Sequence, residues 1–301
     1  MKFSIITPAY TIAKWLPQTI ESILSQQGDF SIEYIIVVND SPDNTLAIAK
    51  EYKQKIEDGS YKIYCNSVSM KVLEFGKPEG THVAINQGVE HATGDVCNWI
   101  GGDDLYEPGA FAAMARVFTA RPDIAWLKGL TSTIGEHGER IKPGYCQHYR
   151  RDWLRMGVYG MEAYHVEQDS TFWRMELWNK VGPVPIQFQK AGDYWLWIRM
   201  ARFEHLISMN VPISCFRKRE GQQSRLGFTQ SLEQRWEARG KRPIGAWIPR
   251  LFFWPYFHSP QSIKKILEKL YPFIFPFTPR PYLEIQNGSV VQKNMKTFFV
   301  R

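Results

Sequence analysis

The first hundred residues alternate short apolar runs with amphipathic segments, and this alternation constrains the fold more than any other feature of the chain. Four apolar runs predict buried strands: residues 3–7, 34–38, 62–65 and 96–100. Three intervening segments carry apolar residues at helical spacing: residues 14–27, 44–56 and 81–92. Strands that alternate with helices of this length predict an α/β fold with a doubly wound, mainly parallel sheet flanked by helices.

The remainder of the chain is less regular. Its pattern predicts a hairpin over residues 132–142 and a helix over residues 192–203. Beyond Gly221 the composition shifts to a polar helical segment, followed by a stretch that is dense in aromatic residues and interrupted by prolines. We therefore expect one α/β domain over residues 1–225 and a helical, aromatic-rich extension over residues 226–301.

The composition excludes several classes of protein. With 44% hydrophobic and 22% charged residues, the chain can bury a core, which excludes a disordered or fibrous protein. The 37 Lys and Arg residues exceed the 30 Asp and Glu residues by 7, which suits an anionic partner such as a nucleotide, a nucleic acid or an acidic membrane. The basic residues do not form one stripe with interleaved aromatics, so we expect no nucleic-acid partner.

The four cysteines are too widely spaced for a zinc ribbon and are expected to be reduced thiols: Cys65, Cys97, Cys146 and Cys215. We find neither a signal-peptide pattern nor an apolar run of the ~18 residues that suggest a membrane span. We therefore expect a cytoplasmic location, with contact at the inner face of the cell membrane as a further option.

Distinctive residues follow three of the predicted strands. They are Thr7-Pro8-Ala9-Tyr10 after the first strand, Asn39-Asp40-Ser41 after the second, and Asp103-Asp104 after the fourth. Ligands of open parallel sheets bind beyond the carboxyl ends of the strands, so we expect these residues to face one crevice. Carboxylates gathered there suit a divalent cation whose coordination is completed by a diphosphate.

Turn chemistry is the alternative for these aspartates, because Asp often follows strands and caps helices. The adjacent pair Asp103-Asp104 favours a ligand site, since Gly101 and Gly102 before it let the backbone approach a ligand closely. Neither GxGxxG nor GxxxxGK[ST] occurs, so phosphate charge would be met by a metal and by separate basic residues.

Taken together, the motifs resemble those of family 2 glycosyltransferases of the GT-A fold, of the bacterial surface-polysaccharide type. The resemblance extends over roughly residues 1–225. It is carried by the three strand-end motifs and by four further segments: Ala84-Ile85-Asn86-Gln87-Gly88, Ala92-Thr93-Gly94-Asp95, Gln168 to Arg174 and Ala191 to Arg199.

The resemblance implies a nucleotide site built from the strand ends. Thr7, Pro8 and Tyr10 would line the pocket for the base and the ribose. Asp40 would meet the base, and Asp103 would lie near the ribose. The implied ligand is a nucleotide-sugar donor.

The resemblance also implies the catalytic groups. Asp104 would hold a divalent metal, Mn²⁺ or Mg²⁺, and Asp193 would be the catalytic base, with Asp169 as the next candidate for that role. Relatives often carry Glu where this chain has Gly192. The alternative for Asp193 is a helix cap without a catalytic role.

Two further candidates have structural alternatives. His82 is expected to touch the donor sugar or phosphate, or else to pack locally at the start of its helix. Arg217, in the basic run that ends at Arg219, is expected to clamp the diphosphate, or else to belong to a solvated turn.

The aromatic stretch Trp247 to Phe277 also contains Arg250, Lys264, Lys265 and Lys269. Such a mixture suits a membrane interface, where rings lie at headgroup depth and cations meet acidic lipids. The alternative is an aromatic face that packs back on the catalytic domain.

We therefore expect an inverting, metal-dependent glycosyltransferase that acts on a glycan or polyprenyl-linked acceptor in surface polysaccharide synthesis. A sugar nucleotidyltransferase is one alternative, but it should carry a glycine-rich loop where this chain has Thr7-Pro8-Ala9-Tyr10. A non-catalytic protein that binds nucleotides or glycans is the other, and metal-dependent hydrolysis of a nucleotide-sugar would separate it from an enzyme.

Overall fold

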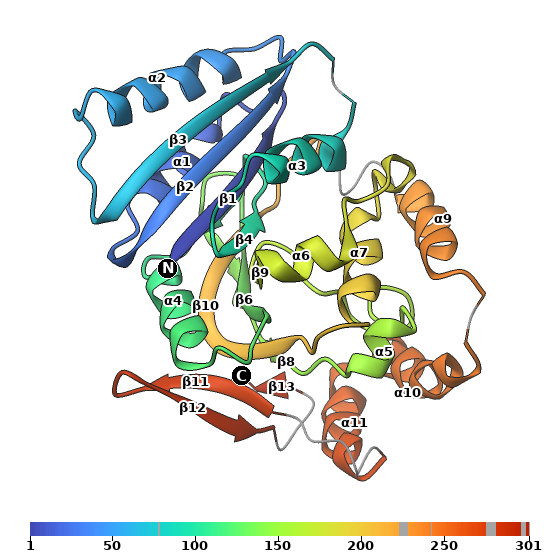
Figure 1. Cartoon of the computed structure of the whole chain (residues 1–301). Coiled ribbons are helices and arrows are strands. Elements are labelled where there is room, and N and C mark those ends of the chain that lie inside the picture. The colour runs from blue at the N-terminus through green and yellow to red at the C-terminus, as the bar shows by residue number, and fades with distance from the viewer. Residues whose placement is uncertain (78, 223–227, 242, 275–280, 296–298, 301) are drawn as a thin grey trace.

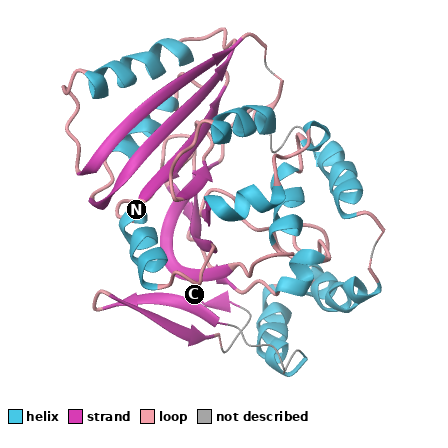
Figure 2. Ribbon diagram, in the orientation of Figure 1, coloured by secondary structure: helices cyan, strands magenta, loops and turns pink. Residues whose placement is uncertain are grey.

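A computed structural model describes residues 1–77, 79–222, 228–241, 243–274, 281–295 and 299–300 of the chain (Figure 1). Eleven of the strands in these ranges form one sheet flanked by helices (Figure 2). The central path of the sheet runs in the order β12-β11-β10-β6-β9-β4-β1-β2-β3.

The N-terminal half of the sheet is parallel, as predicted. Its four strands are β1 (Lys2–Ala9), β2 (Gly28–Asn39), β3 (Cys65–Phe75) and β4 (Val96–Trp99). In register, Ile5 of β1 lies between Tyr34 of β2 and Asn98 of β4. Three helices connect these strands: α1 (Leu16–Leu24), α2 (Thr45–Glu57) and α3 (Thr81–Glu90).

The third strand begins where the predicted one, residues 62–65, ends. The pattern was misleading because β3 is an edge strand that pairs only with β2, so that most of its side chains are partly or fully exposed. Of the β3 side chains, only that of Met70 is buried. A strand of this kind carries polar residues such as Asn66 and Ser69 and lacks a continuous apolar run.

The other half of the sheet is mixed. β9 (Thr171–Arg174) is antiparallel to both of its neighbours, β4 and β6 (Trp126–Ile134). β10 (Ile207–Arg217) runs parallel to β6, while β5 (Leu105–Tyr106) pairs antiparallel with β10. β7 (Arg140–Lys142) folds back on β6, which confirms the hairpin predicted near residues 132–142.

Two apolar cores lie on the two faces of the sheet, because the side chains of each strand alternate between its faces. Phe3 and Ile5 of β1 contribute to the core beneath α1, α2 and α4 (Ala110–Ala120). Ile6 contributes to the opposite core, which is covered by α3 and by helices from the second half of the chain. These helices are α5 (Arg151–Arg155), α6 (Met175–Val181), the short η1 (Ile186–Phe188) and α7 (Gly192–Met200).

The C-terminal extension contains the expected aromatic-rich helices. They are α9 (Phe228–Arg239), α10 (Trp247–His258), preceded by the short η2 (Ile244–Ala246), and α11 (Gln261–Ile274). Among the described residues, no helix combines the length and the apolar character that a bilayer crossing requires. The predicted boundary at residues 225–226, and residues 275–277 of the aromatic stretch, lie outside the described residues.

The extension is not helical throughout, which corrects the prediction for its last part. β11 (Pro281–Gln286) and β12 (Ser289–Asn294) form a hairpin, and β11 adds to the main sheet beside β10. β13 (Phe299–Val300) pairs with β8 (Cys146–Gln147). The hairpin returns to the domain because Leu283 is buried in the same core as Phe3, and Tyr282 packs in a small cluster with Cys146.

Candidate active site

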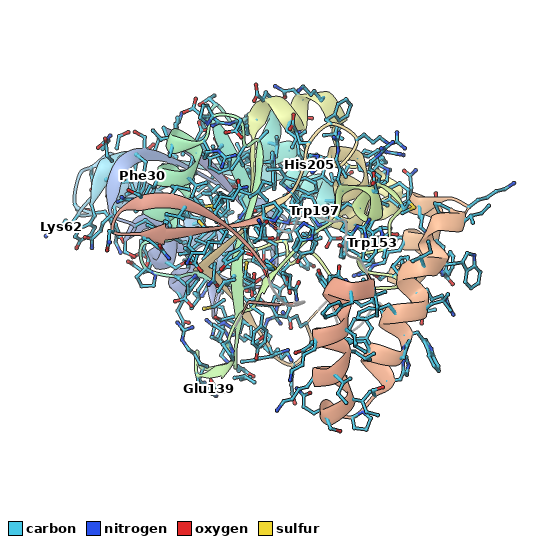
Figure 3. The ribbon with its side chains drawn as sticks, turned by 90° about the horizontal axis from the view of Figure 1, so that it is seen from below. Phe30, Lys62, Glu139, Trp153, Trp197 and His205 are labelled. Carbon is cyan, nitrogen blue, oxygen red and sulfur yellow. The ribbon has the colours of Figure 1, made fainter. Side chains whose placement is uncertain are left out.

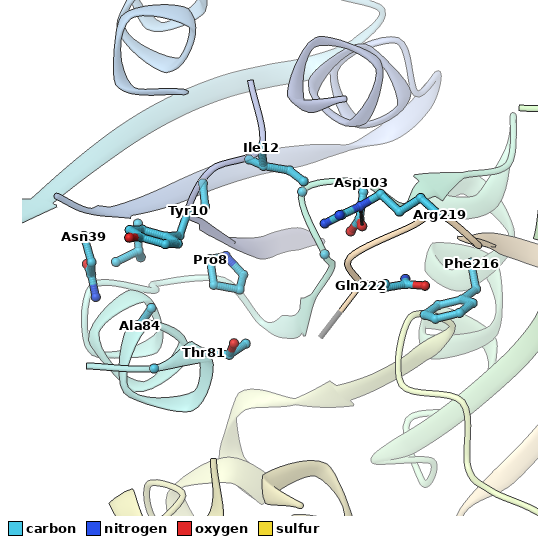
Figure 4. A pocket seen from close by; sticks show the side chains of 15 residues that line it. Pro8, Tyr10, Ile12, Asn39, Thr81, Ala84, Asp103, Phe216, Arg219 and Gln222 are labelled. Carbon is cyan, nitrogen blue, oxygen red and sulfur yellow. Dashed lines mark hydrogen bonds and ion pairs between the residues drawn. The ribbon is translucent and has the colours of Figure 1, made fainter. Parts of the chain in front are cut away.

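A cavity of about 440 Å³ opens at the carboxyl ends of β1, β2 and β4 (Figure 4). Its walls come from five segments that are far apart in the sequence: residues 8–12, 37–39, 80–84, 101–103 and 216–222. The cavity therefore lies where a ligand is expected in an open parallel sheet.

One end of the cavity carries the ring of Tyr10 and the amide of Asn39, with Pro8 beside them (Figure 4). Asn39 is buried, and its Oδ1 has no hydrogen-bond partner among the described residues. A buried acceptor without a partner is costly, and a ligand whose donor reached this oxygen would remove that cost. The sequence predicted that Asn39 faces this crevice together with Asp40 and Ser41, but indicated no separate role for it, because an Asn after a strand is also common in turns.

Two residues of the predicted nucleotide site do not line this cavity. Thr7 is fully buried, and its Oγ1 accepts a hydrogen bond from the Tyr34 hydroxyl at 3.1 Å. Asp40 is exposed and has a φ of 48°, a left-handed conformation that Asp tolerates better than most residues. At the end of β2, Asn39 lines the cavity and Asp40 does not. At the end of β1, Pro8 and Tyr10 line it.

At the other end of the cavity, Arg219 and Asp103 form an ion pair (Figure 4). Arg219 Nε lies 2.6 Å from Oδ2 of Asp103, and its guanidinium group stacks 4.4 Å from the centre of the Trp15 ring. The positive charge is thus held over the cavity wall. Among the basic residues 217–219, Arg219 is the one that a phosphate group in this cavity would contact.

Arg217 has a different role from the one predicted, because its guanidinium group is fully buried and its nitrogens are engaged with the protein. Nε donates to the Asp103 carbonyl at 2.7 Å, Nη1 to the Glu136 carbonyl at 2.8 Å and Nη2 to Oε1 of Gln18 at 2.7 Å. Arg217 does not line the cavity and instead joins the end of β10 to the acidic turn. Of the two arginines, only Arg219 lines the cavity.

Asp104 is buried behind the cavity wall. Its Oδ1 accepts a hydrogen bond from the backbone N–H of Arg217 at 2.7 Å, and its carbonyl accepts one from Thr19 Oγ1 at 2.9 Å. Burial, with the charges of Asp169 and Asp103, raises the pKa of Asp104 well above its ordinary value. A cation beside these carboxylates would relieve that unfavourable accumulation of negative charge.

Gly101 leaves the space in which the two carboxylates of the acidic turn approach each other. A Cβ at this position would lie 2.7 Å from Oδ2 of Asp104 and 3.0 Å from Oδ1 of Asp103. Oxygen donors facing such a gap fit a hard divalent cation. Among the described residues, no group of three or more His, Cys, Asp and Glu side chains forms a complete metal site, so ligand phosphates would have to supply further oxygens.

Asp169 is a further buried carboxyl group near the acidic turn. Burial, together with the charge of Asp103, raises its pKa to about 7, and the charges of Glu167 and Asp193 act in the same direction. Its backbone carbonyl accepts a hydrogen bond from Nδ2 of Asn98 on β4 at 3.0 Å, which fixes the chain at this point. The fold therefore brings Asp169 into the electrostatic field of both Asp103 and Asp193.

Asp193 lies half-buried in the first turn of α7, as its place in the sequence predicted. Its Oδ1 accepts a hydrogen bond from the backbone N–H of Tyr194 at 2.7 Å. This single bond leaves lone pairs on the carboxylate that can accept a proton. Asp193 is not part of the cavity wall itself.

His82 packs against the start of α7. Its Nδ1 lies 3.2 Å from the carbonyl oxygen of Gln189, and its ring meets the Trp99 ring edge to face at 6.0 Å. A Cβ on Gly192 would lie 2.3 to 2.6 Å from atoms of the imidazole, so the glycine makes room for the histidine. Burial lowers the pKa of His82, while the charge of Asp193 opposes that shift.

His82 therefore does not line the cavity, although Thr81 next to it does. The segment 80–84 contacts the cavity through Thr81 and Ala84 and contacts α7 through His82. This segment therefore lies between the cavity and the helix that carries Asp193 and contacts both.

The chain is an α/β protein with a cavity at the carboxyl ends of its parallel strands, and comparison of its sequence identifies the family. Residues 4–176 match the model of glycosyl transferase family 2. The chain is 33% identical over 219 residues to the PGL/p-HBAD biosynthesis glycosyltransferase of Mycobacterium bovis, a match that covers 68% of this chain and 74% of that protein. The chain therefore belongs to glycosyl transferase family 2.

A second relative is much longer than this chain. The minor teichoic acid biosynthesis protein GgaB of Bacillus subtilis is 34% identical over 117 residues, which are 38% of this chain and 12% of GgaB. The match thus spans only about an eighth of that relative.

Two solved structures have the same fold. Residues 1–349 of Staphylococcus aureus TarS, in complex with UDP-GlcNAc, align with a TM-score of 0.56 and 15% identity over 99% of each chain. The mannosyltransferase PcManGT of Pyrobaculum calidifontis, in complex with GDP-Man and Mn²⁺, aligns with a TM-score of 0.58 and 17% identity over 91% of this chain and 72% of that one. These alignments confirm the predicted GT-A fold.

Proposed function

We propose that this glycosyltransferase moves a sugar from a nucleotide-sugar donor to a hydroxyl group of a glycan or polyprenyl-linked acceptor in surface polysaccharide synthesis. The observation that carries the proposal is the cavity with two chemically distinct ends. One end has an aromatic ring and the side chain of Asn39, whose amide oxygen is buried and unpaired, and the other has Arg219 and the carboxylate of Asp103, with Asp104 buried behind it. The names of the two relatives, which concern teichoic acid and PGL/p-HBAD biosynthesis, support a role in surface polysaccharide synthesis.

The donor would lie along the cavity. Its base packs against Tyr10 and donates a hydrogen bond to Oδ1 of Asn39, and its ribose hydroxyls meet Asp103. Its diphosphate then lies toward Arg219, whose planar guanidinium group suits phosphate oxygens. The Asp103–Arg219 ion pair would open as the ribose and the phosphates take its place.

A divalent cation, Mn²⁺ or Mg²⁺, fits the same end of the site. Asp104, with Asp103 across the gap at Gly101, would hold it, and the diphosphate would complete its coordination. Such an ion would neutralise the negative charge that develops on the leaving diphosphate. The binding of PcManGT to GDP-Man and Mn²⁺ in a related fold supports this assignment.

The transfer would be a single in-line displacement. The acceptor oxygen forms a bond to the anomeric carbon while the bond from that carbon to the diphosphate oxygen breaks, and the nucleoside diphosphate leaves. The carboxylate of Asp193 takes the hydroxyl proton as the new bond forms. One displacement inverts the anomeric configuration and needs no covalent enzyme intermediate. The reaction would take place on the cytoplasmic side, at the inner face of the cell membrane where lipid-linked acceptors lie.

The test is a screen of UDP-glucose, UDP-GlcNAc and GDP-mannose with Mn²⁺ or with EDTA. We expect release of a nucleoside diphosphate from at least one donor, with Mn²⁺ only. Release of a nucleoside triphosphate when pyrophosphate is added would indicate a nucleotidyltransferase and contradict the proposal. The absence of both reactions, together with nucleotide binding, would indicate a non-catalytic binding protein.

A further inference from the structure

Helix α10 presents two apolar faces. Phe252, Phe253 and Tyr256 are buried against the rest of the protein, while Leu251 is 75% exposed and Trp254 is 58% exposed on the other side. Ile248, one turn before Leu251, is also exposed. The exposed positions recur every three residues, so they form a stripe along the side of the helix that faces away from the core.

Helix α11 repeats this arrangement. Tyr271 is buried, and Leu267, one turn before it, packs partly against the same core. Four exposed apolar residues follow one another at intervals of three, four and three residues: Ile263, Ile266, Leu270 and Phe273. Phe273 is 78% exposed and Ile266 is 57% exposed. This stripe lies on a different side of the helix from the buried residues.

The inner faces hold the two helices on the catalytic domain. The rings of Phe252 and Tyr271 lie 5.3 Å apart, and the Tyr256 hydroxyl donates to Oε1 of Glu268 at 2.9 Å. The ring of Phe253 contacts that of Trp153, 5.8 Å away. Figure 3 shows both helices, in orange tones, projecting together from the body of the protein near Trp153. Packing against the domain therefore explains why the inner faces of the two helices are apolar, but not why their outer faces are apolar too.

The charges around the stripes indicate what covers them. Residues 244–274 contain four cations and one carboxylate, that of Glu268: the cations are Arg250, Lys264, Lys265 and Lys269. Lys265 and Lys269 are exposed and lie one turn apart, beside the α11 stripe on the side away from the core. Protein–protein interfaces are depleted in Lys, whereas an anionic bilayer attracts it. Exposed indole and aliphatic groups bordered by lysines match the headgroup region of a membrane.

We propose that the outer faces of α10 and α11 form a lipid-docking surface, which holds the catalytic domain on a bilayer that contains anionic lipids. The surface consists of Ile248, Leu251 and Trp254 on α10 and of Ile263, Ile266, Leu270 and Phe273 on α11. Helices of 12 and 14 residues rise only about 18 to 21 Å, so they lie in the plane of the interface. Lipid docking itself does not depend on the proposed function. Only its purpose does, which is to keep the active site near a lipid-linked acceptor.

The experiment is flotation of the full chain with vesicles of phosphatidylcholine alone, or with about one-third phosphatidylglycerol. We expect flotation mainly with the anionic vesicles. The double variant Leu251→Asp/Ile266→Asp should bind at least about tenfold more weakly, because two residues that enter the interface become charged. A matched control, Ile63→Asp/Ile141→Asp, alters two exposed isoleucines elsewhere on the protein and should float like the wild type. The variant Lys265→Glu/Lys269→Glu should lose the preference for anionic lipid.

Equal flotation of the wild type and the Leu251→Asp/Ile266→Asp variant would overturn the proposal. Light scattering without lipid tests whether the surface instead binds a second copy of the protein. If the wild type is a dimer and this variant is a monomer, the surface is a dimer interface and the proposal is wrong. Near-ultraviolet circular dichroism checks that the variants fold. Mn²⁺-dependent hydrolysis of the donor in solution should be unchanged by them, so a failure of lipid docking is distinguishable from a failure of the proposed function.

Discussion

Nε of Arg219 lies 2.6 Å from Oδ2 of Asp103, and this ion pair forms one end of the donor cavity. The pair keeps a cation in place in the absence of phosphate and balances a carboxylate that would otherwise face Asp104 and Asp169. A donor diphosphate would take over the guanidinium group, and the ribose would take over the carboxylate. In the proposed function, the same two side chains pair with each other without a ligand and would contact the donor when it binds.

The first prediction separates the two arginines. Arg219→Gln should weaken binding of UDP or GDP in the presence of Mn²⁺ by roughly 10- to 100-fold, since it removes charge-assisted hydrogen bonds to phosphate. The melting temperature should change little. Arg217→Gln should instead destabilise the fold by about 3–5 kcal/mol, because it leaves buried partners unpaired. Calorimetric titration and thermal melting measure both effects, and a reversed pattern would return Arg217 to the phosphate site.

The second prediction concerns the metal. Asp104→Asn retains an oxygen that can accept the Arg217 N–H, so the fold should persist. The charge that attracts a cation is lost, and the gain in UDP or GDP affinity on adding Mn²⁺ should disappear. Titrations with and without Mn²⁺ give this gain directly. The exposed Asp58, changed to Asn, is the matched control. An undiminished Mn²⁺ effect in Asp104→Asn would place the metal elsewhere.

The third prediction tests the catalytic base. Asp193→Asn preserves the hydrogen bond from Tyr194 N–H but cannot accept a proton. Turnover should fall by roughly 10²–10⁴-fold, while donor affinity and melting temperature barely change. Near wild-type turnover in this variant would contradict the assignment. Asp169→Asn, measured in parallel, would then identify the other carboxyl as the base.

The fourth prediction concerns the contact between His82 and Gly192. Gly192→Ala should cost about 1–3 kcal/mol of stability, because the new methyl group would meet the imidazole at 2.3 to 2.6 Å. In a His82→Ala background the same substitution should cost much less. Denaturant unfolding of the four proteins of this double-mutant cycle gives the coupling. Additive effects would show that the ring moves aside without cost.

The fifth prediction is a pH dependence of stability at Glu33. Burial raises the pKa of this carboxyl group, but hydrogen bonds from Lys71, Ser4 and Thr93 outweigh burial and lower the pKa to about 2. A depressed folded-state pKa stabilises the protein above the unfolded-state pKa near 4.5, and this contribution is lost as the pH falls toward 2.

Glu33→Gln should therefore lower the free energy of unfolding by about 2–3 kcal/mol at pH 7. The difference from the wild type should shrink as the pH falls from about 4.5 to about 2. Urea unfolding across this range measures it. The control is Glu57→Gln, which breaks an exposed pair with Lys53 on the same turn of α2 and should change little at any pH. A difference that does not depend on pH would mean that packing, and not charge, is the cause.

Much of the site could be predicted because it depends on local pattern. Pro8, Tyr10 and Asp103 follow buried parallel strands, and a right-handed β-α-β order brings the ends of such strands to one edge. Neither side-chain packing nor long-range contacts are needed for that inference. The sequence alone therefore determined the fold class and the edge of the sheet at which a cavity opens.

Only the tertiary structure decided which of several similar residues faces the ligand. Arg217 and Arg219 are two residues apart in one basic run, but Gln18, 199 residues before Arg217, takes up its guanidinium group, and Arg219 is left to the cavity. Likewise, Asn39 and not Asp40 lines the wall, since the backbone turns into a left-handed conformation at Asp40. The return of β11 to the sheet also depends on a distant partner, β10. For Arg217 and for β11 the deciding contact joins segments far apart in the chain, and local periodicity carries no information about such contacts.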